Sequence, residues 1–227
     1  MAKFLGLTAL GILLTHSLLA NQVKQSPQSN FVAWEAEACA TNMGFERIHE
    51  NSTPRVPPEA TENAALYCSN QTGGSAPVSP KNIVGYKIVF SSPGSYSIYI
   101  RYYAPGDPSP LADGKPASAN NSIWLPKGFG TQSPTDWIVA HFSNTPNTFI
   151  WKRMMVTLNV TQDDTGKELL MQIGGREKNV ILDRIVLSLD DSLASEDLDG
   201  LKNSEFLNNA PAGYASTVEQ RFPLFLP

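Results

Sequence analysis

The sequence predicts an all-β protein, an antiparallel β-sandwich of the jelly-roll kind. Short runs of alternating apolar and polar residues recur along the chain, and helical periodicity is nearly absent. The 17 prolines and 16 glycines imply many turns between these runs. Roughly nine short strands separated by turns are typical of such a sandwich.

The first twenty residues read as a secretory signal peptide. Lys3 supplies a positive charge, residues 4–14 form an apolar run, and Ala20 is a small residue at which a signal peptidase could cut. The apolar run is shorter than the roughly 20 residues that a membrane-spanning helix needs. The alternative is an uncleaved N-terminal anchor. We expect a secreted or periplasmic chain with no membrane span after signal removal, in which residues 21–30 form a polar linker.

The clearest local pattern is a pair of strands joined by a tight turn. Gly85–Phe90 and Ser95–Tyr103 alternate in polarity, and Ser91–Gly94 between them contains the Pro-Gly pair of a turn. We expect these two strands to form an antiparallel hairpin with one apolar face.

The other strands are shorter, and together they define one domain over residues 31–190. Residues 191–227 lose the strand pattern and are expected to form a C-terminal tail, in which residues 196–206 could hold a short helix. The predicted strands are Phe31–Glu37, Ala64–Cys68, Gly85–Phe90, Ser95–Tyr103, Asn121–Leu125, Asp136–Phe142, Thr148–Val160, Lys167–Ile173 and Asn179–Leu189.

Charge and motifs argue against several classes of function. The formal net charge is −4, with 17 basic and 21 acidic residues, so the chain lacks the basic surface typical of nucleic-acid binding. The sequence contains no nucleophile elbow, no His-Glu-x-x-His pair and no phosphate-binding Gly-rich loop. Catalysis therefore has little support, although a pair of carboxylates among the acidic residues stays open.

The two cysteines, Cys39 and Cys68, are an even pair in a chain expected to be exported. Such a pair favours a disulfide, which would close a loop of about 30 residues and contribute on the order of 3 kcal/mol. The alternative is two small buried thiols.

Four short motifs occur along the chain in a fixed order: Trp34–Glu37, Gly85–Tyr86, Ser92–Tyr102 and Leu182–Leu187. Their order resembles the galactose-binding-like jelly roll of family 6 and family 35 carbohydrate-binding modules. Asn121–Trp124, Trp151 and Gly175–Lys178 are similar to variants attached to polysaccharide-degrading enzymes. The resemblance covers about residues 31–190, whereas the loops at 104–119 and 126–148 are long for the family.

Acidic residues at the two ends of the domain suggest a cation site. Glu35 and Glu37 lie two apart on a predicted strand, so both carboxylates project from one face and repel unless a cation or a basic group separates them. Asp183 lies within the apolar closing strand. In the resembling families a structural calcium joins these two strands, which implies Glu35, Glu37 and Asp183 as Ca²⁺ ligands. The alternative is that Glu35 or Glu37 pairs with Arg184 or faces water.

Aromatic side chains are the usual platforms for sugars, because a ring can lie against the apolar face of a pyranose. The candidates are Trp124, Trp137, Trp151, Tyr67 and Tyr103, although aromatic residues in strands more often belong to the core. The resemblance implies ligand-binding aromatics and an Asn just before the closing strand. By position we expect Tyr67, Trp151 and Asn179 to bind carbohydrate, with Trp137 as a further candidate.

The leading hypothesis is an exported, non-catalytic protein that binds a polysaccharide or oligosaccharide by aromatic stacking and hydrogen bonding. A separate polysaccharide-degrading enzyme would be its second partner. The alternatives are a small lyase or hydrolase of the same shape, and an adhesive or structural surface module that uses the sandwich as a scaffold.

Overall fold

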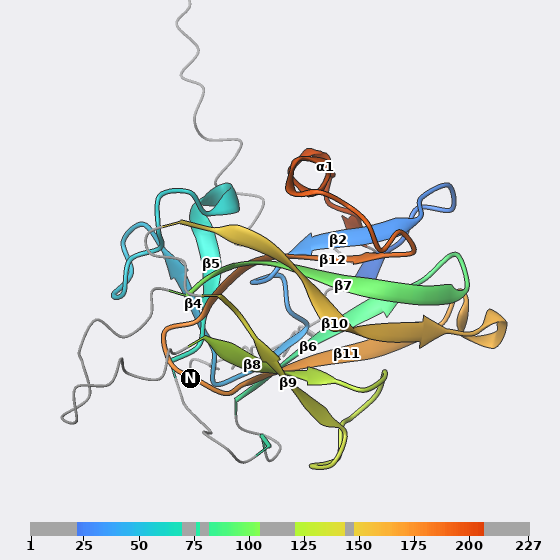
Figure 1. Cartoon of the computed structure of the whole chain (residues 1–227), viewed down its shortest axis with the longest axis horizontal. Coiled ribbons are helices and arrows are strands. Elements are labelled where there is room, and N and C mark those ends of the chain that lie inside the picture. Colours follow the sequence, from blue (N-terminus) through green and yellow to red (C-terminus); the bar gives the residue numbers. More distant parts are fainter. Residues whose placement is uncertain (1–21, 70–75, 78–81, 105–120, 144–147, 207–227) are drawn as a thin grey trace, which may run out of the picture.

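Two β-sheets pack face to face in the computed structural model of the chain, which describes residues 22–69, 76–77, 82–104, 121–143 and 148–206 (Figure 1). The predicted all-β sandwich is confirmed. In chain order the described elements are β1 (Gln22–Lys24), β2 (Phe31–Glu35), β3 (Thr41–Met43), β4 (Glu46–His49), η1 (Thr61–Asn63), β5 (Ala64–Tyr67), β6 (Ile83–Val89), β7 (Gly94–Tyr103), β8 (Ser122–Pro126), β9 (Trp137–His141), β10 (Ile150–Val160), η2 (Gln162–Asp164), β11 (Glu168–Gly175), β12 (Ile181–Ser188), α1 (Ser195–Gly200) and β13 (Glu205–Phe206).

The two sheets use strands from both halves of the chain. Among the described residues, the seven-stranded sheet has the order β13-β1-β6-β11-β8-β9, with β3 also paired to β6. The six-stranded sheet has the order β10-β7-β12-β5-β4, with β2 also paired to β12. Within the described ranges every strand pair is antiparallel except β1 with β6. No helix in the described part of the chain is long and apolar enough to cross a membrane.

The predicted hairpin of residues 85–103 is wrong, because its two strands belong to opposite sheets. Strand β6 lies between β1 and β11, whereas β7 lies between β10 and β12. Both strands turn an apolar face toward the core, so their alternation fits a crossover between sheets as well as a hairpin. The turn needs Gly94, whose φ is 148° and where a Cβ would collide with the Leu189 side chain.

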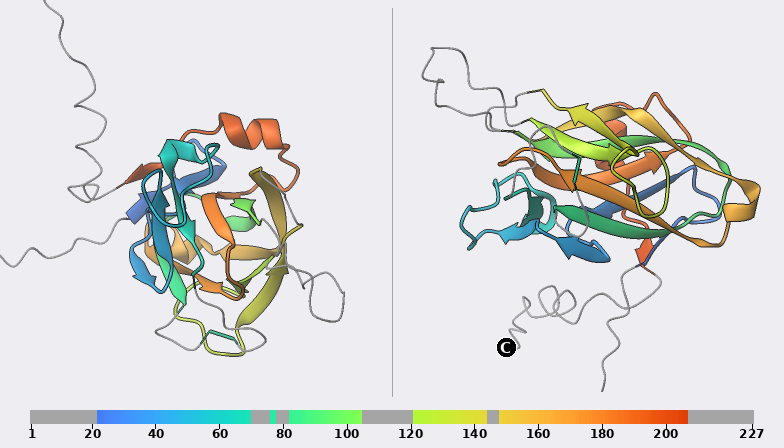
Figure 2. Two further views of the ribbon diagram at one scale, coloured as in Figure 1. Left: turned by 90° about the vertical axis from the view of Figure 1, so that its left-hand side faces the viewer. Right: turned by 90° about the horizontal axis from the view of Figure 1, so that it is seen from below.

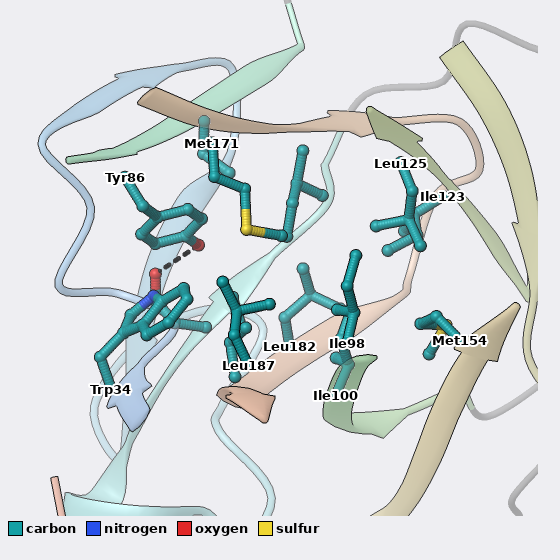
Figure 3. Close-up of a cluster of buried hydrophobic side chains, with 14 of the residues drawn as sticks. Trp34, Tyr86, Ile98, Ile100, Ile123, Leu125, Met154, Met171, Leu182 and Leu187 are labelled. Carbon is teal, nitrogen blue, oxygen red and sulfur yellow. Dashed lines mark hydrogen bonds between the residues drawn. The ribbon is translucent and has the colours of Figure 1, made fainter. Parts of the chain in front are cut away.

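The main core fills the space between the sheets. Figure 3 shows Trp34 and Tyr86 at one side of it and Ile98, Ile100 and Leu182 farther along. The Trp34 and Tyr86 ring centroids are 5.4 Å apart. The buried Tyr86 hydroxyl donates a hydrogen bond of 2.8 Å to the carbonyl oxygen of Ala36, so its polar end is satisfied inside the apolar core.

The segment expected to be a linker is part of the sandwich. Residues 22–24 form β1, and Gln25, which follows, is fully buried. Gln25 Oε1 accepts hydrogen bonds from Ser91 N at 2.9 Å and from the Tyr96 hydroxyl at 3.0 Å, and Gln25 Nε2 donates to the Ser29 carbonyl at 2.8 Å. This side chain therefore fixes the β6–β7 turn.

The start of the expected tail is also ordered against the sandwich. Leu198 of α1 is buried against Ala33, Tyr99 and Val186, which belong to strands of the six-stranded sheet. Arg184 Nη2 donates to the Leu201 carbonyl at 2.6 Å. Residues 205–206 pair with β1. We call residues 190–206 the strap. The sequence did not assign them to the domain, because they are held by one arginine and a few apolar contacts. Such contacts produce no periodic pattern in the sequence.

The predicted disulfide is not formed, and both cysteines are buried thiols. Cys39 Sγ lies 3.7 Å from the Glu37 carbonyl oxygen and 3.9 Å from Arg47 Nη2. Cys68 Sγ packs on Gly175, where a Cβ would lie only 2.7 Å from the sulfur. Each thiol thus has its own packing environment, and burial raises the pKa of the Cys39 thiol, which disfavours the reactive thiolate.

Gln25→Ala should lower the free energy of unfolding by about 1–3 kcal/mol, because it leaves buried donors of the β6–β7 turn without their acceptor. Gln28→Ala, at an exposed position of the same segment, is the matched control and should change little. Urea denaturation measures both. Equal stabilities of the two variants would contradict the role assigned to Gln25.

Alkylation followed by mass spectrometry tests the cysteines. In protein recovered from an oxidising compartment, neither thiol should react in the native state, and both should react after unfolding without reductant. Protein that stays unlabelled after unfolding would instead contain the disulfide.

Candidate functional site

A pocket of about 450 Å³ opens at one end of the six-stranded sheet, the end that faces the viewer in the left panel of Figure 2. Its described lining consists of residues 54–58 with Tyr67, Tyr103, Asn179 and Ile181. Such a mixture of apolar rings and a few polar groups is typical of sites for small ligands.

Strand register builds the floor of the pocket. Ile181, the first residue of β12, lies opposite Tyr67 of β5 on one side and Tyr103 of β7 on the other. Their neighbours Leu66, Leu182 and Tyr102 point into the main core, so the three floor residues face outward. We call Tyr67, Ile181 and Tyr103 the floor row.

Tyr67 and Asn179, two residues that the sequence singled out, meet in this pocket. The Tyr67 hydroxyl donates a hydrogen bond of 2.8 Å to Asn179 Oδ1. Burial raises the pKa of Tyr67, so the hydroxyl keeps its proton at neutral pH. With its carbonyl oxygen engaged, Asn179 offers a ligand the two N–H groups of its amide.

Backbone geometry holds Asn179 at the pocket. Its N–H donates to the Cys68 carbonyl at 3.0 Å, and Cys68 N–H donates to the Val180 carbonyl at 2.9 Å. The φ of Asn179 is 69°, a left-handed conformation that asparagine tolerates better than most residues. The asparagine therefore lies directly across from the end of β5.

The wall of the pocket is the loop of residues 54–58, which carries Pro54, Pro57 and Pro58. Val56 anchors this loop in a small apolar cluster with Ile48, Ala60 and Phe149, beside the floor row. Proline rings give the wall an apolar surface with little conformational freedom. Arg55 is exposed and is the charged residue of the described lining.

Two of the predicted aromatic platforms lie elsewhere. Trp151 is level with Arg101 on β7, farther along the outer face, where the strap covers the sheet. Its ring is half-buried and Nε1 donates to Asp199 Oδ1 of α1 at 2.7 Å. Trp137 of β9 is buried against Ile83 and Trp124. The structure thus brings Tyr67 and Asn179 together and leaves Trp151 and Trp137 outside the pocket.

The pocket also contains Tyr103, a candidate platform that was not among the expected binding residues, and the proline-rich wall, which the sequence motifs did not suggest. Tyr103 was one of several strand tyrosines, and only its register with Ile181 shows that it faces the pocket. Its ring packs against the ring of Phe149, with the two ring centroids 5.6 Å apart. The signal available for the wall was the cluster of prolines between residues 54 and 58.

The predicted calcium ligands are all buried, but they do not form a site of three carboxylates. Asp183 accepts hydrogen bonds from Thr61 and pairs with Arg101 at 2.6 Å, and Glu35 accepts from Asn203 Nδ2 at 2.8 Å. Among the residues that the structure describes, no three His, Cys, Asp or Glu side chains gather as a group that could hold a metal ion. An arginine therefore lies beside Asp183, where the cation was expected, and the calcium stays a prediction from the resemblance.

Several solved structures are similar to this chain. A β-(1,4)-mannanase of Podospora anserina with a family 35 carbohydrate-binding module matches 74% of the chain at 12% identity and a TM-score of 0.49, and the chain spans 29% of its length. A family 35 module of Clostridium thermocellum matches 70% of the chain and 98% of its own length, at 15% identity and a TM-score of 0.44. A family 6 module of a Cellvibrio mixtus lichenase, in complex with cellotriose, matches 69% of the chain and 95% of its own length, at 13% identity and a TM-score of 0.42.

These matches include the two module families that the sequence motifs resemble. No protein-family model matches the sequence, and no curated protein matches it either.

Glu35→Gln should change how stability depends on pH. Burial, with a further contribution from the charge of Asp183, raises the pKa of Glu35 to about 7. The folded state then holds more protons than the unfolded state between the usual carboxyl pKa and 7, so the free energy of unfolding falls as pH rises through that interval, by about 3 kcal/mol.

The glutamine variant should lose this fall, whereas Glu50→Gln, at an exposed position, should keep it. Urea denaturation at pH 5 and at pH 8 makes the comparison. Parallel profiles for wild type and Glu35→Gln would contradict the assignment.

Proposed function

We propose that this chain is an exported, non-catalytic carbohydrate-binding protein that holds part of a polysaccharide or oligosaccharide in the pocket. The observation that carries the proposal is the Tyr67–Asn179 hydrogen bond of 2.8 Å beside the Tyr103 ring, in a pocket that also has an apolar wall. Tyrosine, asparagine and proline together supply ring surfaces and oriented polar groups.

Binding would combine stacking with hydrogen bonding. The floor row gives the apolar face of a sugar ring two tyrosines on which to rest, and the Asn179 amide donates to a hydroxyl or ring oxygen. Tyr67 fixes the orientation of that amide before the ligand arrives, which reduces the ordering cost of binding.

The described lining supports binding rather than catalysis. Its polar side chains are Arg55, Tyr67, Tyr103 and Asn179. Glycoside hydrolysis uses two carboxylic residues on either side of the bond that breaks. The described lining contributes no such pair. We also propose, as a separate part of the hypothesis, that a polysaccharide-degrading enzyme acts on the bound chain.

Export is the second part of the proposal. It is supported by Lys3, the apolar run of residues 4–14 and the small residue Ala20, all of which lie outside the described residues. Cell fractionation followed by N-terminal sequencing of the recovered protein tests it.

Tyr103→Ala and Asn179→Ala should each weaken binding by about tenfold or more, because a few anchoring side chains carry most of the binding energy of a site. Trp151→Ala is the matched control: it removes a larger aromatic ring from the same sheet but from outside the pocket. It should destabilise the strap and leave affinity unchanged. Affinity electrophoresis against a panel of soluble polysaccharides measures all three.

The same panel separates the proposal from its alternatives. Retardation without release of product supports a binding protein. Product release from the wild type would indicate an enzyme, and neither retardation nor product with any polysaccharide would favour an adhesive or structural module. Loss of binding in Trp151→Ala, with binding kept in Tyr103→Ala, would contradict the assigned site.

A further inference from the structure

We propose that Arg101 is a positioning residue for the pocket, and that it joins the loop forming the pocket wall to the sheet through Asp183, where a calcium ion was expected. The inference deepens the proposed function and rests on it only in treating this pocket as the binding site. The contacts that carry it are the same whatever the pocket holds.

Asp183 is the buried charge around which these contacts form. Its side chain is 0% exposed, and it occupies the point at which the pairing of β12 with β7 shifts register. Asp183 Oδ1 accepts from Thr61 N, and Oδ2 accepts from Thr61 Oγ1, both at 2.7 Å. A buried carboxylate needs a compensating charge as well as hydrogen bonds.

Arg101 of β7 supplies that charge and reaches the loop as well. Its Nη1 lies 2.6 Å from Asp183 Oδ2 and donates to the Glu59 carbonyl oxygen at 3.0 Å. The same nitrogen lies 3.4 Å from Thr61 Oγ1. Since Glu59 and Thr61 directly follow the wall residues 54–58, one guanidinium holds the loop at the point where it returns to the sheet.

Phe149 extends these contacts to the floor of the pocket. The Arg101 guanidinium lies 5.1 Å from the Phe149 ring centroid, and that ring supports Tyr103. Glu59 Oε2 accepts from Phe149 N at 3.3 Å and from Thr148 Oγ1 at 3.0 Å. Wall and floor therefore share one set of contacts centred on Arg101.

Two of the three expected calcium ligands, Asp183 and Glu35, each have an arginine beside them. Arg101 compensates Asp183, and Arg184 Nε lies 3.5 Å from Glu35 Oε1. Arg101 Nε also lies 3.8 Å from Asp199 of the strap. Calcium at Asp183 Oδ2 would have to compete with the two donors that this oxygen already accepts from, Arg101 Nη1 and Thr61 Oγ1.

Amide hydrogen exchange, measured without any sugar, tests the inference. The probes are the Ala60 N–H, which donates to the Pro57 carbonyl, and the Thr61 N–H, which donates to Asp183. In wild type, the exchange rate of each of these amides should be the same in calcium as in chelator. Arg101→Met should speed their exchange by at least about tenfold, and Arg101→Lys, which keeps the charge, should restore part of the protection. Trp151→Ala should leave these two amides unchanged.

Two results would overturn the inference. One is that chelator speeds the exchange of Ala60 and Thr61 in wild type to the rate seen in Arg101→Met. The other is that Arg101→Met exchanges these amides no faster than wild type. If Arg101→Met does not fold, the chelator comparison on wild type and the Arg101→Lys variant decide in the same way. Where wild type binds no polysaccharide but shows the expected exchange pattern, the proposed function fails and the role of Arg101 in holding the loop stands.

Discussion

Strand β12 has to pair with β5 and β7 at the same time, and much of the pocket end depends on this constraint. Its register with both neighbours sets Tyr67, Ile181 and Tyr103 in one outward-facing row. The irregularity between Leu182 and Arg184 accompanies the buried Asp183, which contacts Arg101 of β7 and Thr61 of η1, the short helix before β5. Pocket floor and loop anchor are therefore consequences of one set of backbone pairings.

The outer face of the six-stranded sheet is divided between two coverings. At the pocket end, the loop of residues 50–60 lies beside the floor row and forms the pocket wall. Farther along, the strap lies over Ala33, Tyr99 and Val186 and takes up Trp151. Apolar side chains on an outer face are usually shielded from water by another segment or by a ligand. An aromatic residue there can therefore serve as a ligand platform if it lies at the pocket, or pack against the strap if it lies farther along.

Alternating polarity predicted the strands and the sandwich well, since apolar residues at every second position need a core on one side only. It could not assign partners: the alternation of residues 85–90 and 95–103 is the same for a hairpin and for a crossover between sheets. Tyr67 and Asn179 could be chosen because the resemblance implies ligand-binding aromatics at one end of the sandwich and an Asn just before the closing strand. Trp151 could not be excluded, because nothing local in the sequence shows that α1 covers it. The roles of Gln25 and Arg184 rest on contacts between residues far apart in sequence, which leave no periodic pattern.

The central claim is that a carbohydrate binds at the floor row, and NMR titration of the isotope-labelled protein tests it most directly. A polysaccharide that retards the protein in a gel would first be reduced to oligosaccharides, which are then added in steps while backbone amide shifts are followed. The account predicts shifts confined to residues 54–58, Tyr67, Tyr103 and residues 179–181, with Trp151 and the strap unchanged. The account would be contradicted if the floor row showed no shifts and the shifts were instead centred on Trp151 and α1, or on the β8–β9 face around Trp137.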